Sequence, residues 1–134
     1  MNNQIKVVML WLMIVIGIVL HSVLETAEAL YYSPLPEEPY GEGTPVEGHI
    51  IAIAAMIVPM LFGFLSLFLR SKTFIWIALI YASLLGLLNI FHAVADGSLE
   101  NITQLVLLSS VAVINVLLVI TLNNWRKEHL QSED

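Results

Sequence analysis

The stretch FIWIALIYASLLGLLNIFHAVAD, residues 74–96, decides the fold expected for this chain. No charged side chain interrupts it between Phe74 and Ala95, and Asp96 then ends it. At a rise of 1.5 Å per residue, a helix of this length spans about 30 Å, the thickness of the hydrocarbon core of a bilayer. The stretch therefore predicts a transmembrane helix over residues 74–95.

Three more apolar segments of similar length accompany it, at residues 7–32, 49–69 and 101–124. The chain of 134 residues is 58% hydrophobic and only 12% charged, which is typical of membrane proteins. Periodicity inside the segments is weak because lipid-embedded helices are apolar almost all round. We therefore expect an all-α integral membrane protein with one domain, residues 1–134, and four transmembrane helices in an up-down bundle.

The first segment has a second interpretation, as a secretory signal sequence. Lys6 precedes the apolar stretch, and Ala27-Glu28-Ala29 fits a cleavage site of the A-x-A kind. The apolar core is long for a signal sequence, so we expect a membrane helix here.

The cations indicate how the bundle is oriented in the membrane. All five flank apolar segments, and an up-down arrangement of the helices would bring them to the same end of the bundle. They are Lys6, Arg70, Lys72, Arg126 and Lys127. Lysine and arginine concentrate on the cytoplasmic side of membrane proteins, so both termini are expected inside. The tryptophans Trp11, Trp76 and Trp125 would then lie near the inner interface, as an aromatic belt. The expected location is the plasma or inner membrane of a cell.

Residues 33–48 form the expected extracytoplasmic loop. This segment is rich in proline, glycine and acidic residues, which suits an irregular connection rather than a folded domain. The net charge of −6 gives nucleic-acid binding no electrostatic support. The chain has no cysteine, which excludes disulfides and thiolate metal ligands. The lipid bilayer is the expected partner, and homo-oligomers or membrane-complex partners stay open.

Six ionisable side chains gather at the expected outer end of the first three helices. They are His21, Glu25, Glu28, His49, His92 and Asp96. An ionisable group in or beside a membrane segment is costly unless it is paired or bound to a metal, so such groups are candidates for a functional site. Counting helical rise from the cations puts Glu25, His49 and His92 at about 30 Å, with Gln104 of the fourth segment in the same layer. His21 falls one turn deeper on the same face as Glu25.

Imidazoles and carboxylates on separate helices are suitable ligands for zinc or iron, and copper is an alternative if Met56 contributes its thioether. We therefore predict a metal site with His49, His92 and Glu25 as its first ligands. The remaining three, His21, Glu28 and Asp96, are further ligands, ligands of a second metal, or groups that orient the first ones. Glu25 or Glu28 would serve as general base if it does not bind the metal. The competing interpretation is a hydrated rim of polar groups at helix ends.

Such a site would make the protein a metal-binding membrane protein. It would be a metal-dependent hydrolase or oxidoreductase if an open coordination position faced a lipid-like or small substrate. The first alternative is a non-catalytic structural or accessory subunit of a membrane complex. The second is an ion channel or transporter formed by a homo-oligomer, in which Asn115 would line the axis or join protomers, because no polar path crosses one chain. Haem between His49 and His92 is disfavoured, because its propionates would meet acidic residues and no lysine or arginine.

Overall fold

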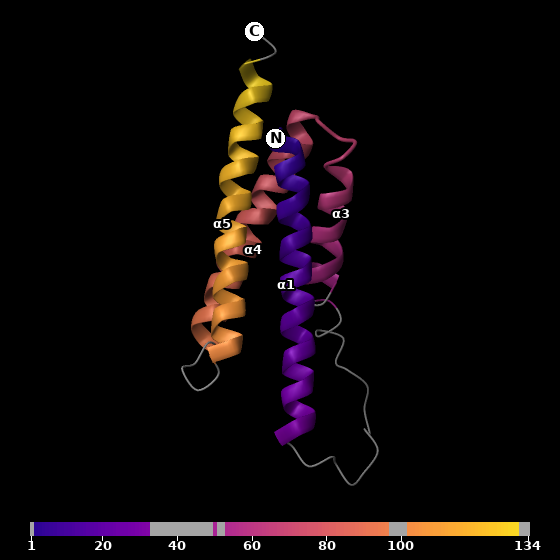
Figure 1. Cartoon of the computed structure of the whole chain (residues 1–134). Coiled ribbons are helices and arrows are strands. Elements are labelled where there is room, and N and C mark those ends of the chain that lie inside the picture. The colour runs from indigo at the N-terminus through magenta and orange to yellow at the C-terminus, as the bar shows by residue number, and fades with distance from the viewer. Residues whose placement is uncertain (1, 33–49, 51–52, 97–101, 132–134) are drawn as a thin grey trace.

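The computed structural model describes residues 2–32, 50, 53–96 and 102–131. These residues are helical apart from short ends and one turn. The helices are α1 (Asn3–Tyr32), α3 (Val58–Leu65), α4 (Lys72–Asp96) and α5 (Ile102–Gln131), and a π-helical stretch, η1 (Ile53–Ile57), leads directly into α3. Successive helices alternate in direction, so α1 begins and α5 ends at the same end of the bundle (Figure 1).

Three of the helices are long and apolar enough to cross a membrane. The spans are Asn3–Glu28, Lys72–Ala95 and Ile102–His129, which confirms three of the predicted segments and indicates a membrane protein. The second predicted segment, 49–69, differs. Its described apolar helix covers only Ile53–Leu65 and ends four residues before the expected boundary. A fourth full-length span is therefore not confirmed.

Pro59 explains the change from η1 to α3. It is fully buried and has no backbone N–H. A π-helix joins each N–H to the carbonyl five residues earlier, so continuing the pattern would require an N–H at residue 59 to satisfy the Ala54 carbonyl. The Tyr81 hydroxyl of α4 donates a hydrogen bond to that carbonyl instead. At the far end of α3, the backbone N–H and the hydroxyl of Ser66 both donate to the Phe62 carbonyl.

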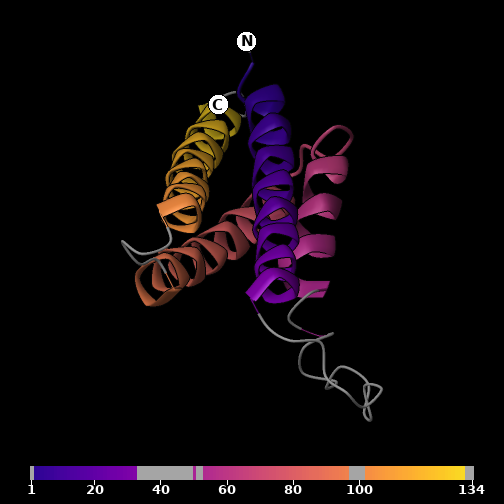
Figure 2. The same ribbon diagram turned by 60° about the horizontal axis from the view of Figure 1, so that its bottom comes forward.

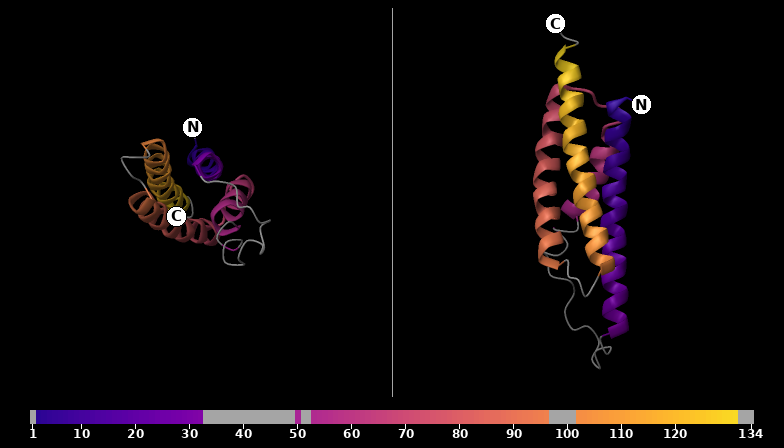
Figure 3. Two further views of the ribbon diagram at one scale, coloured as in Figure 1. Left: turned by 90° about the horizontal axis from the view of Figure 1, so that it is seen from below. Right: turned by 60° about the vertical axis from the view of Figure 1, so that its left-hand side comes forward.

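The core lies where α1, α4 and α5 meet. α5 packs against both α1 and α4, and α3 packs against another side of α1. Figure 2 shows α4 crossing obliquely behind α1, and the left view of Figure 3 shows it from below, running from beside α3 at its start to beside α5 at its end. Buried positions recur every three or four residues, as in Ile75, Ala78, Ala82 and Leu85 of α4 and Val111, Asn115, Leu118, Leu122 and Trp125 of α5.

The outward surface of the long helices is apolar. Large side chains such as Ile16, Leu84 and Val113 are about three-fifths exposed, which is unusual for a protein surrounded by water. Side chains of this kind suit contact with lipid tails, whose polarity matches theirs. The surface therefore supports membrane embedding of the described helices.

The tryptophans depart from the expected aromatic belt. Trp11 is fully buried and stacks on Phe62 of α3, with ring centroids 5.4 Å apart. Trp125 is buried as well, whereas Trp76 is 41% exposed and has the Arg126 guanidinium 4.3 Å from its ring. Trp11 and Trp125 therefore do not face the lipid, because helix packing uses these large side chains to fill the core, and their position near the inner interface stays a prediction.

Two glycines allow α5 to approach its neighbours closely. A Cβ placed on Gly17 of α1 would overlap Cγ2 of Val111. A Cβ placed on Gly86 of α4 would lie 2.8 Å from Nδ2 of Asn115, which is below van der Waals contact. These positions are therefore glycine because a neighbouring side chain of α5 occupies the space.

Candidate functional site

Three helices converge through hydrogen-bonded side chains at the end of the bundle opposite the start of α1, here called the histidine end. His21 of α1 lies between Gln104 of α5 and His92 of α4. Its Nδ1 is 2.7 Å from Gln104 Oε1, and its Nε2 is 2.9 Å from His92 Nε2. The two imidazole rings meet edge to face, with centroids 4.9 Å apart and planes at 84°. These three residues are called the His21 cluster below.

The Gln104 oxygen determines which nitrogen of His21 carries the proton. An amide oxygen only accepts hydrogen bonds, so Nδ1 of His21 is the donor. In a neutral ring, Nε2 is then left with its lone pair, which faces His92. The His21 side chain is only 13% exposed and Gln104 only 5%, so neither readily exchanges this contact for water. The cluster therefore holds the His21 ring in one orientation with Nε2 as an acceptor.

Glu25 is the acidic side chain that the described structure brings to His21. Its Oε2 lies 3.9 Å from His21 Nε2, one turn away on α1, and its side chain is 70% exposed. Glu28 follows on the same helix and is partly exposed. His49 and the side chain of Asp96 lie outside the described residues. Within the part of the chain that the structure describes, no three His, Asp or Glu side chains are close enough to hold a metal ion.

The structure gives the predicted site residues relative positions that differ from those expected by counting helical rise. That count set His21 one turn below the other groups, whereas the structure puts it at the centre of the cluster. The count treats every helix as upright, whereas α4 runs obliquely to α1 (Figure 2), so it rises less than 1.5 Å per residue along the bundle axis. Gln104 was expected only in the same layer, yet it is the buried partner of His21. An amide inside an apolar segment is the signal that points to such a role.

A cavity of about 440 Å³ lies beside the His21 cluster, within the range of small-molecule sites. It is lined by residues of α1, η1, α4 and α5. His21, His92 and Glu25 belong to its wall, and most of the rest is apolar, including Met56 of η1 and Leu108 of α5. The site therefore combines a small polar cluster with apolar walls.

A second polar contact joins α4 and α5 deeper in the bundle. Asn115 is fully buried, donates from Nδ2 to the Ala82 carbonyl at 2.7 Å, and accepts at Oδ1 from Asn89 Nδ2 at 3.1 Å. Its amide is therefore used within the chain. The expectation that Asn115 lines the axis of an oligomer is wrong, because a fully buried side chain bonded inside one chain faces no neighbour.

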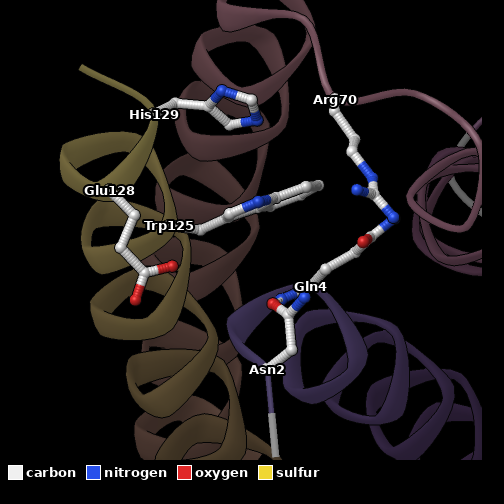
Figure 4. A pocket seen from close by; sticks show the side chains of 6 residues that line it. All are labelled: Asn2, Gln4, Arg70, Trp125, Glu128 and His129. Carbon is white, nitrogen blue, oxygen red and sulfur yellow. Dashed lines mark hydrogen bonds between the residues drawn. The ribbon is translucent and has the colours of Figure 1, made fainter. Parts of the chain in front are cut away.

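The opposite end of the bundle holds a smaller pocket of about 200 Å³, shown in Figure 4. Its polar groups serve the fold. Gln4 Nε2 donates to the Ser66 carbonyl at 2.8 Å and to the Leu67 carbonyl at 3.1 Å, which ties α1 to the turn after α3. Glu128 accepts from Asn3 at 2.7 Å, which ties α5 to α1. The polar residues of this pocket therefore connect α1, α5 and the turn after α3.

The His21 cluster and its cavity carry the functional argument, because they unite buried polar groups from three helices with room for a ligand. Comparison of this chain with protein-family models, with curated proteins and with solved structures finds no match.

Proposed function

We propose that this chain is an integral membrane protein that binds a divalent transition-metal ion through His21 and His92, with Glu25 as the neighbouring carboxylate. Zinc and iron are the expected metals, because both accept mixed imidazole and carboxylate ligands. His49, Glu28 and Asp96 stay candidates for further ligands.

The convergence of the two Nε2 atoms is the observation that carries the proposal. They lie 2.9 Å apart. Two imidazole nitrogens at about 2.0–2.1 Å from one ion are roughly 2.9 Å apart at a right angle and roughly 3.4 Å apart at the tetrahedral angle. The two rings thus need little or no movement to bind one ion between them, and His92 would bind as the tautomer that carries its ring proton on Nδ1 instead of Nε2.

Gln104 supplies the second support. A histidine that binds a metal through one nitrogen commonly donates its other N–H to an oxygen, which fixes the ring and raises its basicity. Nδ1 of His21 donates to Gln104 Oε1 in this way, and the lone pair of Nε2 is turned toward His92. A ring that is already oriented loses little freedom when the metal binds.

Glu25 supplies negative charge beside the two imidazoles. Its Oε2 is 3.9 Å from His21 Nε2, and its exposed side chain can change rotamer without breaking packing. An anionic ligand favours binding of a dication where lipid lowers the local dielectric.

The distribution of cations supports an orientation for the proposed site. Lys6, Arg70, Lys72, Arg126 and Lys127 accompany the end at which α1 begins. Under the positive-inside rule, that end is cytoplasmic, both termini are inside, and the histidine end faces the extracytoplasmic side. The chain would then cross the plasma or inner membrane four times, with the segment that contains η1 and α3 as the second crossing.

Elemental analysis tests the metal proposal. Protein purified without a nickel column should contain about one zinc or iron ion per chain, or take one up on addition. His21→Ala and His92→Ala should each lose most of this metal, because each removes a ligand. His129→Ala is the matched control, since His129 lies by the pocket at the opposite end. Its metal content should equal that of the wild type.

Two results would overturn the assignment. One is wild-type protein that is metal-free and takes up neither zinc nor iron. The other is His92→Ala protein with unchanged metal content and unchanged helical circular dichroism.

A further inference from the structure

The cavity beside the His21 cluster opens on the surface of the bundle. Its lining includes Glu25, with 70% of its side chain exposed, and Leu88 and Phe91 of α4, which are 55% and 71% exposed. Leu88 and Phe91 belong to a span that is long and apolar enough to cross a membrane. A molecule dissolved in the lipid can therefore reach the cavity from the side of the bundle.

The walls of the cavity select for an apolar body. Met56 of η1, Leu88 of α4, and Leu108 and Val111 of α5 line it, and none of them carries a charge. At about 30 Å³ per non-hydrogen atom, the share of one water molecule in the liquid, about 440 Å³ holds roughly fifteen such atoms. This size fits a medium-length hydrocarbon chain with a small head group.

The polar side of the cavity selects the head group. His21, His92 and Glu25 all line the cavity, so an ion bound at the two Nε2 atoms stands at the cavity wall. A dication with the Glu25 carboxylate keeps a net charge of about +1, which is costly in a medium of low dielectric. A ligand with one negatively charged oxygen group removes this charge and supplies an oxygen donor to the ion. Without the ion, the same group would meet the carboxylate of Glu25 and be repelled.

We propose that the cavity binds a medium-chain amphiphile with one carboxylate, of the fatty-acid class, whose carboxylate coordinates the ion held by His21 and His92. The hydrocarbon chain lies along Met56 and Leu108. This inference rests on the proposed metal site and adds the class of ligand. Its distinctive consequence is that binding of the carboxylate depends on the metal.

Decanoate is a suitable probe, because its roughly twelve non-hydrogen atoms fit within the roughly fifteen that the cavity holds. Binding of labelled decanoate is measured on protein in lipid nanodiscs, with empty nanodiscs subtracted, in the presence of zinc and after its removal by a chelator. We expect zinc to tighten decanoate binding by at least about tenfold. Decanol, which has the chain without the carboxylate, should show no such dependence.

A matched pair of variants tests the place of binding. Ala55→Phe fills the cavity from η1 and leaves the proposed ion ligands His21, His92 and Glu25 in the sequence, so it should weaken decanoate binding by about tenfold or more while zinc affinity stays unchanged. Ala112→Phe introduces the same side chain on α5, in a separate surface groove between Ile90 and Val116. It should change neither binding constant.

The outcomes separate the two proposals. Failure of the protein to bind zinc would overturn the metal site. Normal zinc binding with equal decanoate affinity in its presence and absence would overturn only the ligand class. Equal zinc dependence of decanol would overturn it too, because the carboxylate would then have no role. Unchanged decanoate binding in Ala55→Phe protein would place the ligand outside this cavity and contradict the inference.

Discussion

His21 joins three helices through its two ring nitrogens. Rotation of the ring about either side-chain torsion would break the contact with Gln104, the contact with His92, or both. The ring is also largely buried, so water does not readily replace these partners. Its position is therefore determined by α4 and α5 as much as by α1. Any function of the histidine end therefore depends on the relative positions of α1, α4 and α5.

Replacement of Gln104 by leucine tests the role of its oxygen. The two side chains are similar in size, so Gln104→Leu should insert and fold, but it removes the acceptor for Nδ1 of His21. We expect zinc affinity to fall by about 10- to 100-fold, the usual effect of removing a partner that orients a metal ligand. Competition with a chelating dye measures this change.

Gln4→Leu is the control for the same chemical change at the opposite end. There it removes the donor to the Ser66 and Leu67 carbonyls, so it should lower the free energy of unfolding by about 1–2 kcal/mol. Zinc affinity should stay at the wild-type value. Equal losses of affinity in the two variants would contradict a specific role for Gln104.

At the scale of elements, η1 and α3 depend on α4 for part of their backbone hydrogen bonding. Pro59 gives no N–H, and the Tyr81 hydroxyl bonds to the Ala54 carbonyl that this N–H would otherwise reach. The Tyr81 ring also packs on Phe62 of α3, with centroids 5.1 Å apart. One side chain of α4 thus provides both a polar and an apolar contact to the short element.

A double-mutant cycle between Pro59 and Tyr81 tests this dependence. Tyr81→Phe should lower the free energy of unfolding by about 1 kcal/mol, because a carbonyl loses its donor. In a Pro59→Ala background the restored N–H can serve the Ala54 carbonyl, so the same change should cost less. Reversible unfolding in detergent micelles measures the difference.

Tyr31→Phe provides the reference for the cycle, since Tyr31 lies near the end of α1 and is 87% exposed. Its effect on the free energy of unfolding should be the same in the wild-type and the Pro59→Ala backgrounds. An equal cost of Tyr81→Phe in both backgrounds would show that the hydroxyl does not replace the missing N–H.

At the scale of the whole molecule, the two ends differ in charge and in chemistry. Introduced cysteines can test the proposed orientation, because the chain has none of its own. Tyr31→Cys lies at the histidine end and Lys127→Cys at the opposite end. A maleimide that does not cross membranes should label Tyr31→Cys on intact cells and Lys127→Cys only after permeabilisation. Labelling of Lys127→Cys on intact cells, and of Tyr31→Cys only after permeabilisation, would show the opposite orientation.

The sequence predicted the long helices well because length and apolar composition suffice for them. Lys72–Ala95 matches the expected 74–95 closely. It did not predict the break at Pro59, because an apolar composition looks the same in a continuous helix and in η1 followed by α3. It singled out His21, His92 and Glu25, but not the pairing of His21 with His92, which depends on the crossing of α4. His49 and the side chain of Asp96 lie outside the described residues, so their part in the site stays a prediction.

The close approach at Gly17 has a consequence for divergence among homologous chains. A methyl group there would overlap Val111, and one at Gly86 would overlap Asn115. Residue sizes at positions 17 and 111 should therefore covary, with a larger residue at 17 appearing only beside a smaller one at 111. Because Gly17 and Val111 also line the cavity, such exchanges would change its shape as well. Homologues that keep Gly17 together with His21 would be the ones expected to share the ligand of this protein.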